Sequence, residues 1–319
     1  MKVNINPELL LWAIEQGQPD LTTLSERFPK YQAWINGEDS PSFPQLEAFC
    51  KFLKVPLGYM FLEQPPPEPE IITEFRTIDN YALQDMSKNL RDTIVHMDLL
   101  RTWMREYRIE EGIDTVEFIG KGAGVEEPKR LADIFLNVLE LQVGFSHMYK
   151  KADDLFKALR AKIEALGVLV FIKGYVGGST RRTLNTTEFR AFTLADDIAP
   201  VIFINGRDAI KARIFSLVHE FMHLLLGRDG ISKNVQAETI CNRATITALA
   251  PIELIVHEAH EANVEKPYRV TFDYQFSKPL RQAIANQLQT GRLQYQQAFT
   301  LTGLSQVRTI NDMAERAML

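Results

Sequence analysis

The sequence predicts an α+β protein that is mostly helical and has more than one domain. Its 319 residues, 45% of them hydrophobic, are enough for two or three ordinary domains. A proline-rich stretch at residues 63–70 separates a short N-terminal segment from the rest of the chain. Beyond this stretch, apolar residues recur at helical intervals, apart from three short β-branched runs that precede residue 208.

The expected domain limits follow these changes in composition. Residues 1–62 form a small helical unit, and residues 63–70 form an extended linker. Residues 71–263 combine a helical region with the part that holds the β-branched runs. Residues 264–319 form a C-terminal helical region.

The composition also predicts where in the cell the protein is located. A formal net charge of −5 gives no overall basic field that would attract nucleic acid or an anionic membrane. No apolar run approaches the ~20 residues of a membrane helix, and no signal-peptide pattern opens the sequence. Cys50 and Cys241 lie in apolar helical patterns, which predicts buried free thiols. We therefore expect a cytoplasmic protein without disulfides.

Short helices are expected throughout residues 1–62. One opens at Pro7 and stops at Gly17, the next is capped by Asp20, and another opens at Pro44. This order resembles the repressor-type (XRE-like) helix-turn-helix domain, and the residues that carry the resemblance are Trp34, Gly37, Pro41, Gln45 and Leu46.

DNA binding by this unit has little support from the sequence. Only residues 29–33 are available for a recognition helix between the second expected helix and Trp34. The unit also carries five basic and seven acidic residues, a balance of −2 that opposes contact with phosphates. A degenerate domain used for packing or for protein recognition is the favoured interpretation, and DNA binding is the alternative.

Three longer helices and three strands are expected beyond the linker. The helices cover residues 83–107, 129–141 and 153–166, and the strands cover residues 168–172, 189–194 and 200–205. His96 and His147 stand alone in this region and are expected to be surface or packing residues. The strands predict a small mixed sheet that packs against the helix that follows them.

That next helix, expected at residues 208–226 and ended by Gly227, carries the pattern His219-Glu220-x-x-His223. Residues i and i+4 share one face of a helix, so the two imidazoles can hold one metal ion while Glu220 faces a water on it. The flanking residues are apolar, and burying three polar side chains among them is costly unless they bind something. Metal binding is therefore favoured over a surface helix with outward-pointing histidines.

A catalytic zinc site needs a third protein ligand and keeps one position open for water. Glu238 is the best candidate, because it follows a glycine-containing turn and opens a helix expected at residues 234–249. Asn242, one turn later, is expected to hydrogen-bond a ligand. The rival ligands are His257 and His260, an i, i+3 pair in a polar segment.

Several blocks around the motif are similar to one known family. They are residues 188–192, 199–205 and 212–218, and Glu238-x-x-Cys241-Asn242 leading into Ala250-Pro251. Together they resemble the ImmA/IrrE family of zinc metallopeptidases. Glu74-Phe75-Arg76-Thr77 after the linker resembles members with an N-terminal repressor-like domain, and residues 276–304 resemble the C-terminal helical region of the family.

The resemblance implies a zincin-like fold and a gluzincin-like site. Zn²⁺ would be bound by His219, His223 and Glu238, with Glu220 as the catalytic base. It further implies a protein substrate, typically a DNA-binding repressor or similar regulatory partner, cleaved in a stress, mobile-element or toxin–antitoxin context.

The reaction also needs a donor for the developing oxyanion, and Arg190 and Tyr175 are the candidates. Their alternative roles are a structural ion pair and a half-buried aromatic residue. The expected function is that of a zinc-dependent endopeptidase. The first alternative is a transcriptional regulator or antitoxin-like binding protein that uses its metal site for sensing or scaffolding. The second is a pseudoenzyme with structural zinc.

Overall fold

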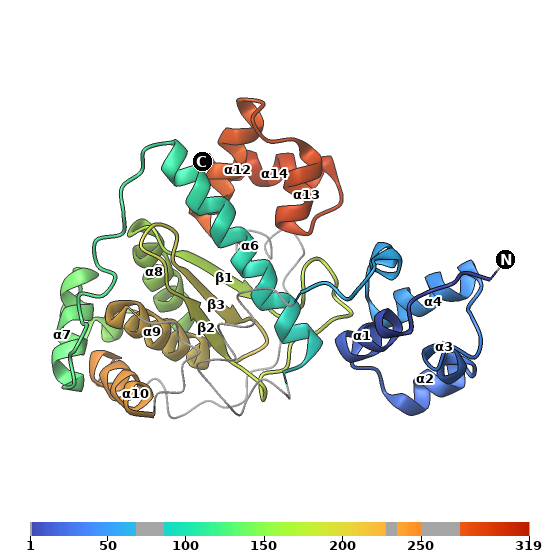
Figure 1. The fold of residues 1–319 in the computed structure, drawn as a ribbon. Coiled ribbons are helices and arrows are strands. Elements are labelled where there is room, and N and C mark those ends of the chain that lie inside the picture. Colours follow the sequence, from blue (N-terminus) through green and yellow to red (C-terminus); the bar gives the residue numbers. More distant parts are fainter. Residues whose placement is uncertain (1, 68–85, 228–234, 250–274, 319) are drawn as a thin grey trace.

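The computed structural model describes residues 2–67, 86–227, 235–249 and 275–318 (Figure 1). Within these ranges the chain is mostly helical and contains one three-stranded sheet, so the predicted α+β class is confirmed. No helix in the described part is long and apolar enough to cross a membrane. The predicted domain limits stay predictions, and those near residues 70 and 263 fall outside the described residues.

The N-terminal unit consists of short helices. They are α1 Pro7–Gly17, α2 Leu21–Arg27, α3 Tyr31–Ile35, α4 Phe43–Leu53 and the 3₁₀ helix η1 Leu57–Phe61. The predicted cap of α2 is present, because the Asp20 side chain accepts a hydrogen bond of 2.8 Å from the Thr23 amide. At five residues, α3 is short for a helix that reads DNA. The repressor-like character of the unit stays a prediction.

An aromatic core holds these helices together. Phe49 makes edge-on contacts with Phe28 and Trp34, with ring centroids 5.2 and 5.8 Å apart. Cys50 is buried in the same core as a free thiol, and burial raises its pKa to about 11. Cys241 is also a buried free thiol, so the prediction for both cysteines is confirmed. At neutral pH Cys50 is protonated and behaves as a small apolar side chain.

Three helices lead from the N-terminal unit to the sheet: α6 Lys88–Glu110, α7 Pro128–Val138 and α8 Ala152–Ala165. The predicted start of α6 near residue 83 was wrong. Ser87 is extended and caps the helix, because its side chain accepts a hydrogen bond from the Leu90 amide. Helix α7 ends three residues before residue 141, since Glu140 takes a left-handed conformation with a φ of 50°.

The sheet is mixed, as predicted. Its strands are β1 Leu169–Lys173, β2 Ala191–Leu194 and β3 Val201–Asn205, in the order β1-β3-β2. Strand β1 is parallel to β3, and β2 is antiparallel to it. One face packs on α8 and on α9 Ile210–Leu226, and the other packs on α6 and the C-terminal helices (Figure 1). Those helices are α12 Lys278–Gln289, α13 Tyr295–Thr302 and α14 Val307–Ala317.

A buried ion pair joins the C-terminal helices to the sheet. Arg160 of α8 lies 3.0 Å from Glu164 and donates to the carbonyl oxygens of Val170 and Phe276, at 3.2 and 2.9 Å. Glu164 also accepts from the backbone amide of Lys278, at 3.3 Å. Arg160 therefore hydrogen-bonds a backbone carbonyl oxygen of β1 that does not face β3, and it holds the residues that lead into α12.

The sheet face toward α6 contains a buried amine. Lys173 is 2% exposed, and its Nζ has no hydrogen-bond partner among the described residues. Nζ lies 4.0 Å from the ring centroid of Phe276. Burial lowers the pKa of Lys173 from 10.5 to about 7. His96 of α6 hydrogen-bonds the Leu301 carbonyl oxygen at 2.8 Å, and burial together with the Lys173 charge lowers its pKa to about 4.

Replacing this lysine tests the burial directly. Between pH 7 and 10.5 the unfolded chain holds a proton on Lys173 that the folded chain has released, so folding stability rises with pH in this window. We predict that Lys173→Met raises the free energy of unfolding at pH 7, on the order of a few kcal/mol. It should also flatten the rise in stability between pH 7 and 10, measured by chemical denaturation.

The control is Lys129→Met, which removes an exposed lysine of α7. A Lys173→Met protein that is less stable than the wild type at pH 7 would contradict the prediction. An unchanged dependence of stability on pH would also contradict it.

Candidate metal centre

The motif lies on α9 Ile210–Leu226, in the interior of the protein. Helix α9 packs between the sheet on one side and α7, α8 and α10 Val235–Leu249 on the others (Figure 1). Phe118 stacks on Phe221 at a centroid distance of 4.7 Å. The helix ends as predicted at Gly227, whose φ of 66° is left-handed and suits a residue without Cβ. This position in the core disfavours the surface-helix interpretation.

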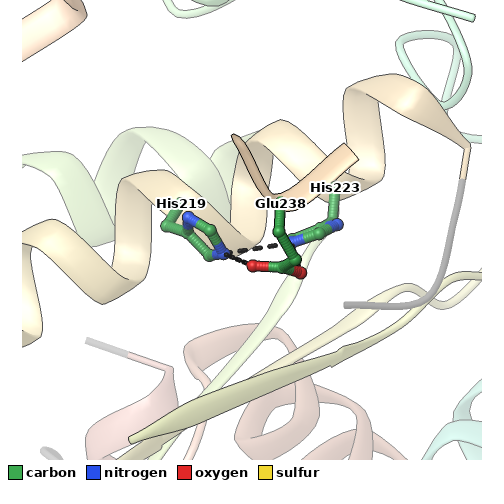
Figure 2. Close-up of side chains that lie close together, drawn as sticks. All are labelled: His219, His223 and Glu238. Carbon is green, nitrogen blue, oxygen red and sulfur yellow. Dashed lines mark hydrogen bonds and ion pairs between the residues drawn. The ribbon is translucent and has the colours of Figure 1, made fainter. Parts of the chain in front are cut away.

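Helix α10 Val235–Leu249 brings Glu238 to the two histidines. Figure 2 shows the three side chains converging from α9 and α10. His219 Nε2 lies 3.0 Å from His223 Nε2 and 3.3 Å from Glu238 Oε2, and His223 Nε2 lies 3.1 Å from Glu238 Oε1. One ligand atom from each residue lies within 4.8 Å of the others.

Solvent can approach this group from one side. The His223 side chain is fully buried and that of His219 is 12% exposed, whereas that of Glu238 is 32% exposed. Both Nδ1 atoms lack a hydrogen-bond partner among the described residues. The two imidazoles are therefore held by the interior of the protein, and solvent reaches the ligand atoms on the side of Glu238.

The three side chains also perturb each other's protonation. Burial acts to raise the pKa of Glu238, but hydrogen bonds from His219 and His223 outweigh it and lower the pKa to about 2. Burial acts to lower the pKa of His219, but the hydrogen bond to Glu238 and the charge of Glu220 raise it overall. An ionised carboxylate and two imidazoles whose ligand atoms converge on one point are suited to bind a divalent cation. Their donor types and number are those of a catalytic zinc site.

The central part of the chain is similar to a known family. Residues 163–271 match the model of the IrrE N-terminal-like domain (Peptidase_M78). The match covers about a third of the chain and includes the sheet, α9 and α10. It supports a metallopeptidase, and the family is generally zinc-dependent, in line with the His219, His223 and Glu238 group. No curated protein and no solved structure matched the chain.

Within the matched region, Glu220 lies beside the two histidines and is 4% exposed. Burial raises its pKa, and the charges of His223 and His219 act in the opposite direction. Its Oε2 has no hydrogen-bond partner among the described residues. A buried carboxylate oxygen without a donor, next to a metal-ligating group, is available to accept a proton.

The other predicted site residues lie in less direct positions. The Arg190 side chain is 67% exposed, and its Nε is 3.7 Å from Asp208 Oδ2. The Tyr175 hydroxyl accepts a hydrogen bond of 2.6 Å from the Gln275 side chain. These contacts match the alternative roles, an ion pair and a half-buried aromatic residue. Among the described residues, no hydrogen bond or ion pair joins either side chain to the three metal-binding candidates.

Asn242 is exposed on α10, and the described contacts include no hydrogen bond from it to His219, His223 or Glu238. The rival ligands His257 and His260 lie outside the described residues. The hydrogen bond expected from Asn242 to a ligand, and the choice between Glu238 and the histidine pair, therefore stay predictions.

One contact of the site was not anticipated from the sequence. Thr193 of β2 is fully buried, and its hydroxyl donates to the backbone carbonyl oxygen of Glu220 at 3.2 Å. The available signal was a threonine in the run Phe192-Thr193-Leu194, where a purely packed strand would carry a third apolar residue. It became interpretable only when the structure placed β2 against α9.

Removing a ligand tests the metal centre. We predict that His223→Ala and Glu238→Ala each weaken zinc binding by about 100-fold or more, because each removes one of three protein donors. The measurement is competition with a chromophoric chelator, together with the zinc content of the purified protein. Arg243→Ala, an exposed change on α10, is the control and should bind zinc like the wild type. Wild-type affinity in both ligand variants would contradict the assignment.

Proposed function

We propose that the chain is a zinc-dependent endopeptidase of the ImmA/IrrE type. The observation that carries the proposal is the buried Glu220 carboxylate, whose Oε2 has no hydrogen-bond partner among the described residues, beside the converging His219, His223 and Glu238. The family match over the same elements supports it. A purely structural zinc site gives a poorer account, since such sites usually use thiolates, and the nearby Cys241 is not part of the converging group.

When bound, zinc supplies Lewis-acid activation of a water molecule and of the scissile carbonyl group. His219, His223 and Glu238 hold the ion, and none of them is free for proton transfer. Glu220 is the general base that takes the proton of the attacking water at its carboxylate and passes it to the leaving amine. Its burial favours this cycle, because a raised pKa makes the carboxylate a better proton acceptor.

The sheet beside the site supports a polypeptide substrate. Asn205 donates to the Arg190 carbonyl oxygen at 2.8 Å, so by antiparallel alternation Phe192 and Leu194 bond to β3. The amide and carbonyl groups of Ala191 and Thr193 then point away from β3. No described strand pairs with this side of β2. An extended protein segment can bind there through its backbone.

For the developing oxyanion, Arg190 and Tyr175 remain the proposed donors. Arg190 directly precedes β2, and its exposed side chain can reorient when a substrate binds. The Tyr175 hydroxyl accepts a hydrogen bond from Gln275, so its own proton remains available. It can donate this proton to the oxyanion when the proton points away from Gln275.

We further propose that the substrate is a DNA-binding repressor or a similar regulatory partner, in a stress, mobile-element or toxin–antitoxin context. The N-terminal unit supports protein recognition more than DNA reading, because it is acidic overall and α3 has only five residues. Under the alternative function, a transcriptional regulator, the protein would bind an operator with strong salt dependence and leave its partner intact.

The test is co-expression with the regulatory protein encoded beside it, followed by mass analysis of that partner. The wild type should cleave the partner, whereas Glu220→Gln should keep its zinc and lose cleavage by at least about 100-fold, because the amide cannot act as a base. Undiminished cleavage by a zinc-loaded Glu220→Gln protein would rule out the base assignment. An intact partner with salt-dependent operator binding would favour the regulator.

A further inference from the structure

The sheet face that packs against α9 has one polar position. The strand residues of this face are Val170, Ile172, Ala191, Ile202, Ile204 and Thr193. Thr193 lies opposite Ile202 in the middle of β2 and is fully buried. Valine has nearly the same shape and would bury no hydroxyl group. A buried hydroxyl costs free energy unless it is hydrogen-bonded, so this one is explained by what it contacts.

Among the described residues, this hydroxyl hydrogen-bonds with Glu220. It donates to the Glu220 carbonyl oxygen at 3.2 Å, and a hydrogen bond from the same hydroxyl acts to lower the pKa of the Glu220 carboxyl group. A hydroxyl has one proton and donates to one acceptor at a time. Both acceptors belong to the same residue, so the contact fixes Glu220 relative to the sheet.

Strand β2 is itself held firmly. Arginines at positions 101, 105 and 108 form one stripe along α6 and bind the turn that follows β2. Their acceptors are the Ala195 carbonyl oxygen at 3.4 Å, the Asp196 and Asp197 carboxylates at 2.8 and 2.7 Å, and the Ile198 carbonyl oxygen. Phe192 also stacks on Phe203 of β3 at 5.0 Å. Thr193 therefore projects from a rigid element.

We propose that Thr193 is a positioning residue for Glu220 in the peptidase reaction. The inference rests on the proposed function, because it assumes that Glu220 is the base. A single neutral donor on a fixed strand can orient the carboxylate without neutralising its charge. Glu220 Oε2 is left without a donor and is free to take up a proton. The Thr193 hydroxyl thus acts through Glu220, and among the described residues no hydrogen bond joins it to His219, His223 or Glu238.

The kinetic test compares Thr193→Val and Thr193→Ser with the wild type, on the partner protein that the co-expression experiment identifies. Valine keeps the shape and loses the hydroxyl, so kcat should fall by about 10- to 100-fold while KM and zinc content stay unchanged. Serine keeps the hydroxyl and should restore kcat to within about 3-fold of the wild type. The proposal is overturned if the valine variant keeps the wild-type kcat, or if serine fails to rescue it.

The matched control is Thr93→Val. Thr93 of α6 is also a buried threonine whose hydroxyl donates to a backbone carbonyl oxygen, that of Asn89 at 2.7 Å. This bond lies within α6 and makes no contact with Glu220. Thr93→Val should therefore leave kcat unchanged, which separates positioning of the base from a general loss of stability.

A second experiment does not depend on activity. Denaturation midpoints are measured for the wild type, Thr193→Val, Glu220→Leu and the double variant. Glu220→Leu removes the carboxylate and keeps the backbone carbonyl, so the shifts should be non-additive if the hydroxyl contacts the carboxylate. Additive shifts overturn the proposal. If the wild type cleaves no partner, the proposed function has failed, whereas the double-variant comparison still decides whether the contact exists.

Discussion

The convergence of α9 and α10 on one point is the constraint on which the site depends. Helix α9 is buried among the sheet and three helices, so its two histidines and Glu220 cannot be solvated as surface residues would be. Glu238 from α10 compensates by meeting both imidazoles within hydrogen-bonding distance. A divalent cation at this point would satisfy the same three side chains more completely. The packing of α9 against α10 thereby brings the three candidate metal ligands together.

The sheet and α6 supply the rigidity that this chemistry needs. Three arginines of α6 hold the turn between β2 and β3, and Thr193 of β2 reaches the Glu220 carbonyl oxygen. At the opposite edge of the sheet, Arg160 and Glu164 attach the start of α12 to β1. The buried amine of Lys173 destabilises the core between the sheet, α6 and the C-terminal helices, and it accounts for part of the expected dependence of stability on pH.

Much of this arrangement could be predicted from the sequence, where local signals decide the outcome. Pro7, Asp20 and Gly227 mark helix ends by their own chemistry, and the i, i+4 histidines share a helix face by geometry. The start of α6 could not be predicted from periodicity, because the Ser87 side chain caps the helix and fixes where it begins. The contact of Thr193 with Glu220 and the burial of Lys173 depend on which elements become neighbours. The local sequence pattern does not show which helices and strands will pack against each other.

The central claim is that His219, His223 and Glu238 bind one metal ion. Zinc K-edge X-ray absorption on the full-length, zinc-loaded protein tests it most directly, with Glu238→Ala as the comparison. The predicted result is two imidazole ligands, no sulfur, and a changed spectrum in the variant. A sulfur ligand, more than two imidazoles, or a spectrum unaffected by Glu238→Ala would contradict the account.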